Sequence, residues 1–139
     1  MSVECFLDTN VLVYALSAAP EDAAKKAAAL ELITGSDFGL SVQVLQEFYV
    51  VVTGKIRRTL SPEVAASLLE EYRLFPLALT DYPLVVSAIE ISLRYALSYW
   101  DGAIIAAAET LQAPVLFTED LSHGQLYGSV RALNPFWET

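Results

Sequence analysis

Short apolar segments alternate with longer helical segments along the whole chain, and this alternation constrains the fold more than any other feature. Strands that alternate with helices in this way are typical of a parallel sheet with helices on both faces. The sequence therefore predicts an α/β fold. The segments predicted as strands lie near residues 3–7, 38–41, 75–79, 114–117 and 130–133.

Helix boundaries are indicated by residues that favour or end a helix. Ser61-Pro62-Glu63 is typical of a helix start, because Ser caps the first turn and Pro fits its first position. We expect this helix to reach Arg73. Asp81 and Ser98 are predicted as the caps of two later helices. Besides 62–73, the segments predicted as helices lie near residues 9–16, 21–33, 42–52, 83–96, 99–111 and 121–127.

The composition predicts one globular domain over residues 1–139, because 55% of the residues are hydrophobic and the length suits a single core. No apolar run reaches the roughly 18 residues that span a bilayer, and the start of the chain lacks the basic segment of a signal peptide. Cys5 is the only cysteine, and its place in the first predicted strand indicates a buried thiol. Together these features predict a cytoplasmic protein without a membrane segment.

The net charge of −9 weighs against non-specific binding of nucleic acid, because contacts to phosphate need Lys and Arg. An acidic composition also arises when carboxylates gather to hold divalent cations. Composition alone leaves both possibilities open. The few basic residues include a cluster of Lys55, Arg57 and Arg58, which is either a solvated loop or a local patch that contacts phosphate.

Two acidic residues directly follow predicted strands. Asp8 comes after the first strand, and Asp120 comes just after the fourth. In open α/β sheets, ligands bind at the carboxyl ends of the strands, so an acid there is placed for function. Asp120 has an alternative role as the N-cap of the helix predicted after it. Thr118 offers a hydroxyl near the same strand end. Glu119 is expected to point away from Asp120 and to be exposed.

Two further acids lie on predicted helices. Glu47 falls at the border of the apolar face of its helix, where a side chain can reach a cleft, although an exposed glutamate shows the same pattern. Asp101 lies near the first turn of a helix that is apolar around most of its circumference, which indicates burial. Ser98 and Asp101 also have the spacing of a capping box. Capping and metal binding do not exclude each other.

Four carboxylates in one cleft would repel one another. Two unit charges about 4 Å apart repel by about 4 kcal/mol at an effective dielectric constant of about 20. Such a cluster therefore needs cations or protonation. Ligands that are all oxygen suit Mg²⁺ or Mn²⁺. Zinc is disfavoured, because the chain has one histidine and one cysteine.

The segments around these acids resemble the motifs of PIN-domain proteins. Residues 6–15, Phe-Leu-Asp-Thr-Asn-Val-Leu-Val-Tyr-Ala, resemble the opening motif of the family. Glu47, Asp101 and Asp120 match its remaining acidic positions in order, and the resemblance spans about Val3 to Leu133. Small members of this length are commonly the toxin half of type II toxin–antitoxin pairs, of the VapC type.

The resemblance implies a three-layer α/β/α fold with a parallel sheet of about five strands. It also implies a ribonuclease that depends on Mg²⁺ or Mn²⁺, is often a homodimer, and is inhibited by a small antitoxin protein. The acidic net charge fits general RNA binding poorly and favours a restricted substrate.

By position, the resemblance makes Asp8, Glu47, Asp101 and Asp120 the metal-binding and catalytic acids. Asp8, Asp101 and Asp120 would hold one or two cations, and Glu47 would hold a second cation or orient the attacking water. Such cations lower the pKa of a bound water and stabilise charge on the scissile phosphate. In-line attack would leave a 5′-phosphate and a 3′-hydroxyl.

Other polar and aromatic residues have supporting or alternative roles. Asn10 and Thr118 would position water, metal or a ligand carboxylate. For His123, an exposed or structural role is favoured over contact with substrate or proton shuttling. For Trp100, which precedes Asp101, packing is favoured over base stacking. The candidate substrate contacts are Lys55, Arg57, Arg58 and His123.

Two other functions stay open. One is a catalytically silent PIN-like module that binds protein partners, which the presence of all four acids disfavours. The other is a metal-dependent phosphoesterase that acts on a different substrate. A phosphatase of the haloacid dehalogenase type is disfavoured, because it needs a second acid two residues after the first, where this chain has Asn10.

Overall fold

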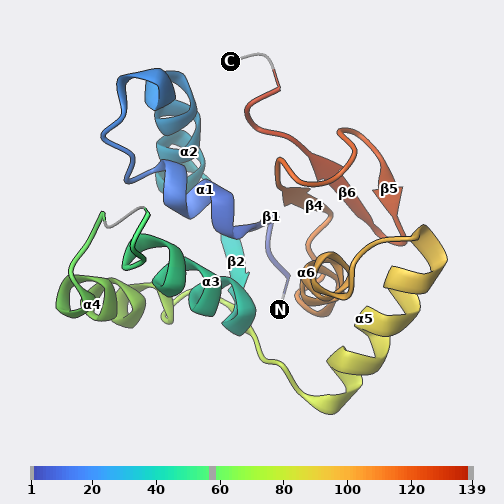
Figure 1. Ribbon diagram of the computed structural model, residues 1–139. Coiled ribbons are helices and arrows are strands. Elements are labelled where there is room, and N and C mark those ends of the chain that lie inside the picture. Colours follow the sequence, from blue (N-terminus) through green and yellow to red (C-terminus); the bar gives the residue numbers. More distant parts are fainter. Residues whose placement is uncertain (1, 57–58, 138–139) are drawn as a thin grey trace.

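The computed structural model describes residues 2–56 and 59–137, and within them the strands form one mixed, mostly parallel sheet (Figure 1). The strand order is β3-β2-β1-β4-β6-β5, and every pair is parallel except β5 with β6. The strands are β1 (Cys5–Leu7), β2 (Phe38–Ser41), β3 (Leu77–Ala78), β4 (Val115–Phe117), β5 (Leu126–Tyr127) and β6 (Val130–Leu133).

The sheet has one strand more than the five expected, and the helix predicted near 121–127 is wrong. In its place the chain turns and forms β5, which pairs antiparallel with β6. Gly124 and Gly128 have φ angles of 84° and 60°, in the left-handed region that favours glycine. Two such residues within one short segment prevent a continuous right-handed helix.

The helices begin where the sequence predicts caps. Ser61 accepts a hydrogen bond from the N–H of Val64, and Asp81 accepts one from the N–H of Leu84. Ser41 caps the helix after β2 in the same way. The helices are α1 (Thr9–Tyr14), the 3₁₀ turn η1 (Pro20–Asp22), α2 (Ala23–Gly35), α3 (Val42–Val52), α4 (Pro62–Tyr72), α5 (Tyr82–Tyr95) and α6 (Tyr99–Thr110).

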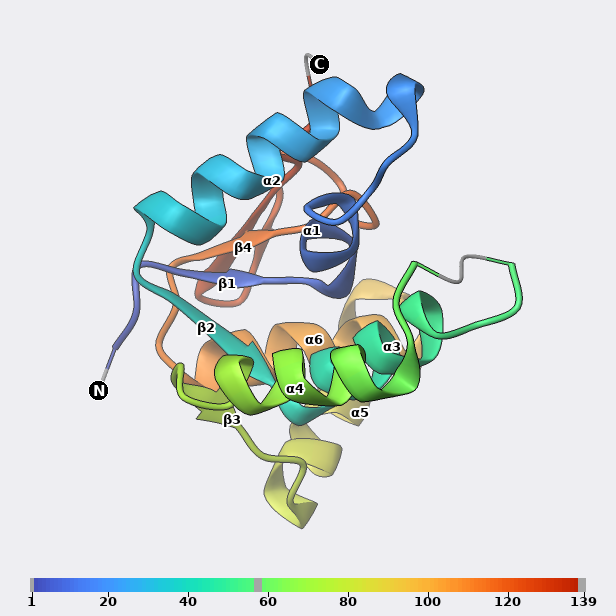
Figure 2. The same cartoon turned by 90° about the vertical axis from the view of Figure 1, so that its left-hand side faces the viewer.

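Helices cover both sides of the sheet. Helices α1 and α2 lie on one side of β1 and β4, and α5 and α6 lie on the other (Figure 2). Helix α3 contacts α1 and β2, and α4 packs on α3. Phe6, Phe38 and Phe48 are among the largest fully buried side chains, and Cys5 is buried as expected. In the part of the chain described, no helix is both long and apolar enough to cross a membrane.

The order of the strands creates a switch point between β1 and β4. The chain runs from β1 to β2 and β3 on one side, and then returns to β4 on the other side of β1. Leu7 of β1 lies opposite Phe117 of β4 in the parallel register. The next residues, Asp8 and Thr118, therefore emerge side by side at the carboxyl edge. In open α/β sheets, this is where ligand crevices form.

Close contact between α5 and α6 holds the start of α6 next to this edge. A Cβ atom added at Gly102 would lie 2.5 Å from the carbonyl oxygen of Ala88 on α5. We expect Gly102→Ala to force the helices apart and to lower the free energy of unfolding by about 1–3 kcal/mol, measured by urea denaturation.

The matched control is Gly35→Ala at the end of α2, where an added Cβ meets nothing within 4 Å. Both changes exchange a helical glycine for alanine, so the control adds the same methyl group where it meets no neighbour. Equal stability of the two variants would contradict the packing effect.

Candidate functional site

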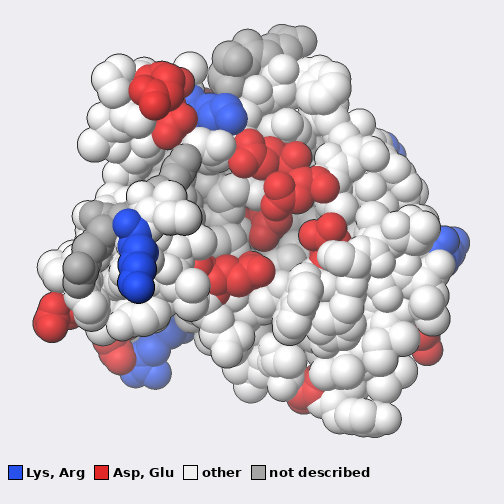
Figure 3. All heavy atoms as spheres, viewed as in Figure 1, with Lys and Arg blue, Asp and Glu red and all other residues white. Residues whose placement is uncertain are grey.

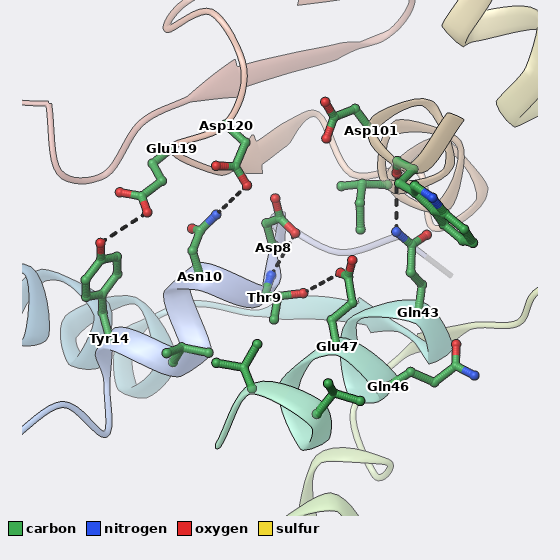
Figure 4. A pocket seen from close by; sticks show the side chains of 15 residues that line it. Asp8, Thr9, Asn10, Tyr14, Gln43, Gln46, Glu47, Asp101, Glu119 and Asp120 are labelled. Atoms are coloured by element: carbon green, nitrogen blue, oxygen red, sulfur yellow. Dashed lines mark hydrogen bonds between the residues drawn. The ribbon is translucent and has the colours of Figure 1, made fainter. Parts of the chain in front are cut away.

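A cavity of about 690 Å³ opens at the switch point (Figure 4). Acidic and apolar side chains both line it, and they come from α1, α3, α6 and the segment after β4. The charged lining residues are Asp8, Glu47, Asp101, Glu119 and Asp120. The apolar and aromatic lining residues are Val13, Tyr14, Val50, Val51, Trp100 and Ile104.

Asp8 is the most buried acid of the cavity, with 6% of its surface exposed. Its Oδ1 accepts a hydrogen bond of 2.7 Å from the backbone N–H of Thr9, and its Oδ2 accepts one of 2.7 Å from the Thr118 hydroxyl. Burial outweighs these bonds and, with the charges of Asp120 and Glu47, raises the pKa of Asp8 to about 7. Among the described residues, Asp8 has no cationic partner to offset the burial of its charge.

Thr118 and Asn10 connect Asp8 to Asp120. The Thr118 hydroxyl, which donates to Asp8, accepts the backbone N–H of Asp120 at 3.1 Å. The Asn10 amide donates from Nδ2 to Asp120 Oδ2 at 3.1 Å, whereas its buried Oδ1 has no hydrogen-bond partner among the described residues. Because residues 121–127 form no helix, Asp120 does not cap one. Its exposed carboxylate faces Asn10 (Figure 4).

Glu47 reaches the cavity from α3, at the border of the apolar face of that helix. Its Oε1 accepts a hydrogen bond of 2.8 Å from the Thr9 hydroxyl. Gln43, one turn earlier, is 8% exposed and donates from Nε2 to the carbonyl of Trp100 at 3.3 Å. Glu47 is therefore anchored to α1, while α3 is joined to the first turn of α6.

Asp101 approaches from the opposite wall, in the first turn of α6 (Figure 4). The Ser98 hydroxyl accepts the backbone N–H of Asp101 at 3.1 Å, so Ser98 caps the helix as expected. The Asp101 side chain is half-buried and lines the cavity. Capping by Ser98 uses the backbone of Asp101 and leaves its carboxylate available to the cavity.

The four expected acids share one cavity but do not form a compact ligand set. Within residues 2–56 and 59–137, no three His, Cys, Asp or Glu side chains are spaced to hold a metal ion. The side chains of Asp8, Glu47 and Asp120 accept hydrogen bonds from hydroxyl, amide and backbone N–H groups, all of them neutral. The donor set is all oxygen, as a hard divalent cation requires.

Acidic side chains gather on the face shown in Figure 3. Figure 3 shows Asp and Glu side chains gathered in and around a hollow, with little positive charge in the middle of that face. A cation in this hollow would meet a strongly negative field. An RNA phosphate alone would be repelled by it.

Glu119 differs from its expected exposed position. It is half-buried, accepts a hydrogen bond from the Tyr14 hydroxyl at 3.2 Å, and pairs with Lys25 at 3.5 Å. The Lys25 ammonium also lies 3.1 Å from the Tyr14 hydroxyl and 4.7 Å from the centre of its ring. The expectation failed because Tyr14 and Lys25 are 105 and 94 residues away from Glu119 along the chain.

The candidate substrate contacts lie outside the cavity or outside the described residues. Lys55 is exposed and does not line the cavity, and Arg57 and Arg58 fall outside the described residues. His123 is exposed and has two structural partners: its Nδ1 accepts the N–H of Asn134 at 2.9 Å, and its ring stacks on Trp137. These contacts match the structural alternative for His123.

Sequence reasoning missed Thr9 and Gln43. Thr9 follows Asp8 in the opening motif and places its hydroxyl on Glu47. Gln43 lies one turn before Glu47 on α3, and its side chain is buried. In the sequence, the only indication of a role was that each residue lies one helical turn or less from an acid. Polar residues are common at such positions in proteins, with or without a functional site.

The raised pKa of Asp8 predicts the direction in which the stability of the protein changes with pH. The pKa of about 7 in the folded protein lies above the ordinary 3.8, so the folded state holds this proton more tightly than the unfolded chain. Asp8 therefore lowers the free energy of unfolding as the pH rises from about 4 to about 7, by roughly 4 kcal/mol in all, and adds no further loss above that. Without metal, Asp8→Asn should be more stable than wild type at about pH 8 and should lose this advantage near about pH 4.

Urea denaturation in EDTA at both pH values measures this difference. Asp37→Asn, at an exposed aspartate outside the cavity, controls for the loss of one negative charge. If the stability of Asp8→Asn relative to wild type were the same at both pH values, the buried charge of Asp8 would carry no cost.

Solved structures of known proteins share this fold. FitAcB from Neisseria gonorrhoeae superposes with a TM-score of 0.68 at 22% identity, over 96% of this chain and 99% of that one. VapC20 of Mycobacterium tuberculosis, described as a sarcin–ricin loop cleaving toxin, gives 0.67 at 20% identity, over 84% and 91%. A toxin–antitoxin complex from Klebsiella pneumoniae gives 0.68 at 15% identity, over 94% and 97%.

At these identities, the structural likenesses show a shared fold and no more. No curated protein matches the sequence significantly. The family model of the PIN domain matches residues 5–128, which is most of the chain and includes all four expected acids. The chain therefore belongs to the PIN domain family.

Proposed function

We propose that this protein is a metal-dependent endoribonuclease. The observation that carries the proposal is the buried Asp8 carboxylate at the switch point, which lies among other acids and has no cationic partner in the described chain. A buried charge of this kind is costly unless it is paired or binds a metal. Membership of the PIN family, and solved neighbours that are toxins or toxin–antitoxin complexes, support a nuclease.

Asp8, Asp101 and Asp120 are the proposed ligands of Mg²⁺ or Mn²⁺, and Glu47 is a further ligand or orients water. The buried Oδ1 of Asn10, which has no hydrogen-bond partner among the described residues, adds one more oxygen beside Asp120. When bound, a divalent cation lowers the pKa of a coordinated water and offsets negative charge on the scissile phosphate.

The residues of the chain prepare the site for that chemistry. Thr9 and Thr118 hold the two oxygens of Asp8 in place, so this carboxylate needs no reorganisation to accept a ligand. Glu47 is held through Oε1 by Thr9, which leaves its other oxygen to orient a water. In-line attack by that water on the phosphorus would break the bond to the 3′ oxygen and leave a 5′-phosphate and a 3′-hydroxyl.

We further propose that the protein is the toxin of a type II toxin–antitoxin pair and acts on RNA in the cytoplasm. The solved neighbours that include antitoxins support a small protein partner. A homodimer is supported by an exposed apolar stripe along α5. The residues of this stripe are three or four positions apart and therefore lie on one face of the helix. The stripe is Tyr82, Val86, Ile89 and Leu93.

A silent protein-binding module is the second candidate, and one observation favours it: the described acids do not form a compact ligand set. The two functions differ in whether the folded protein binds a cation. Binding to the native state alone stabilises a protein, by about 2.7 kcal/mol at 100 times the dissociation constant. Cation binding can thus be measured without any assay of activity.

We expect Mn²⁺ to raise the melting temperature of the wild-type protein, and Asp8→Asn to abolish most of that increase. Glu31→Gln, which removes an exposed acid of α2 outside the cavity, is the control and should respond like wild type. Differential scanning calorimetry with and without Mn²⁺ measures the shift. A wild-type melting temperature that Mn²⁺ does not change would favour the silent module.

We also expect the wild-type protein to cleave RNA with Mg²⁺ or Mn²⁺ and to lose this activity in excess EDTA. Asp8→Asn should lower kcat by at least about 100-fold, because it removes a charge at the centre of the proposed ligand set. Single-turnover cleavage of a labelled RNA, with analysis of the product ends, measures both effects.

Glu31→Gln again serves as the control, with activity equal to wild type. Expression in a bacterial host should arrest growth for wild type and Glu31→Gln but not for Asp8→Asn. Undiminished cleavage by Asp8→Asn, or equal cleavage in EDTA, would overturn the metal-dependent mechanism.

A further inference from the structure

We propose that Trp100 is a base-stacking residue that holds an unpaired base of the RNA beside the acidic wall of the cavity. This inference rests on the proposed ribonuclease function and adds to it a positioning residue and a requirement for RNA whose bases are splayed out. It differs from the packing role expected for Trp100 from the sequence.

The indole of Trp100 is large, apolar and open to solvent. It is 63% exposed, although it lines the cavity and directly precedes Asp101. Its ring meets Tyr99 edge to face, at 5.0 Å between centres and 81° between planes. Such a contact covers at most one face of the indole. The other face is available to a flat partner.

The backbone of Trp100 is fixed, although its ring is exposed. Its carbonyl accepts the hydrogen bond from the buried Gln43 side chain at 3.3 Å, which joins α6 to α3. The residue lies in the first turn of α6, where Ser98 caps the helix. A stacking residue with a fixed backbone loses little conformational freedom when it binds a base.

The other tryptophan, Trp137, differs from Trp100 because its indole already has a stacking partner. Trp137 is exposed to nearly the same degree, 62%, but its ring already stacks on His123, at 4.4 Å between centres and 13° between planes. Trp137 does not line the cavity. The chain thus has two similarly exposed indoles, of which one has a parallel stacking partner.

The charge of the protein favours a contact of this uncharged kind. With a net charge of −9 and an acidic cavity, binding cannot depend on attraction between protein and phosphate alone. Stacking of a base on an aromatic ring needs no charge and contributes about 1–3 kcal/mol per base. Val50 and Val51, 67% and 37% exposed, line the same cavity and extend its apolar lining.

The occupant is a base of single-stranded or looped RNA, because a base in a duplex is covered on both faces by its neighbours. A phosphate next to the stacked base would lie near Asp101, the following residue, and so near the proposed site of cleavage. Stacking would therefore place the scissile bond as well as hold the chain.

The two tryptophans allow a direct test by fluorescence. In a Trp137→Phe protein with Asp8 intact, Trp100 is the only tryptophan, and Ca²⁺ in place of Mn²⁺ keeps a divalent cation available to the acids while cleavage is slowed during the titration. We expect a short unpaired RNA oligonucleotide to quench its fluorescence, and a duplex of the same sequence to do so much less. Replacing single bases by abasic positions should identify the stacked base, at which quenching is lost.

Variants at each tryptophan measure the contribution to cleavage. Trp100→Ala should raise KM for unpaired RNA by roughly 5- to 150-fold, which is the fold-change that corresponds to the stacking contribution. Trp100→Phe should restore most of the affinity, because a phenyl ring still stacks. Trp137→Ala is the matched control and should leave KM unchanged.

Circular dichroism and melting temperatures of all variants show whether each is folded. Two results would overturn the stacking role and leave the ribonuclease function in place. One is the same KM for Trp100→Ala and Trp137→Ala. The other is Trp100 fluorescence that unpaired RNA does not change, while the wild-type protein still cleaves that RNA. If folded wild type neither binds nor cleaves any RNA, both proposals fail.

Discussion

The parallel pairing of β1 with β4 is the constraint on which the rest of the structure depends. It brings Asp8 beside Thr118 at the point where the chain changes direction across the sheet. Thr118 then connects Asp8 to Asp120, so the geometry of this edge follows from one pair of strands. The same pairing buries the Asp8 carboxylate and raises its pKa to about 7. A fold shaped for stability alone gains nothing from a charge there, which argues for a ligand of opposite charge.

Most of the fold could be predicted from the sequence, because its helix starts are encoded locally. Ser61 and Asp81 each bond to an N–H three residues later, and such short-range signals are visible in the chain itself. The segment 121–127 was predicted wrongly, because its partner in the sheet, β6, lies outside the segment.

Less of the site could be predicted. The strand-end positions of Asp8 and Asp120 follow from the order of strands and acids along the chain, and these residues do line one cavity. The hydrogen bond from Thr9 to Glu47 joins residues 38 apart and depends on how α1 packs on α3. No pattern in either segment encodes that packing angle. For the same reason, the sequence could place the acids at one edge but could not show that their carboxylates stay apart.

The acidic net charge of the whole protein fits RNA binding poorly. The cavity, however, has two kinds of lining, one acidic and one apolar, and each has its own role in the proposed binding. One part of the lining carries the carboxylates, whose charge suits a cation, and another carries Val50, Val51 and the exposed indole of Trp100. A nucleotide has two matching parts, an anionic phosphate that a cation can bridge to the acids and an uncharged base that an apolar surface can hold. An RNA bound in this way would depend less on surface lysines or arginines. Under the proposed function, such binding would also discriminate against duplexes, whose bases are not available.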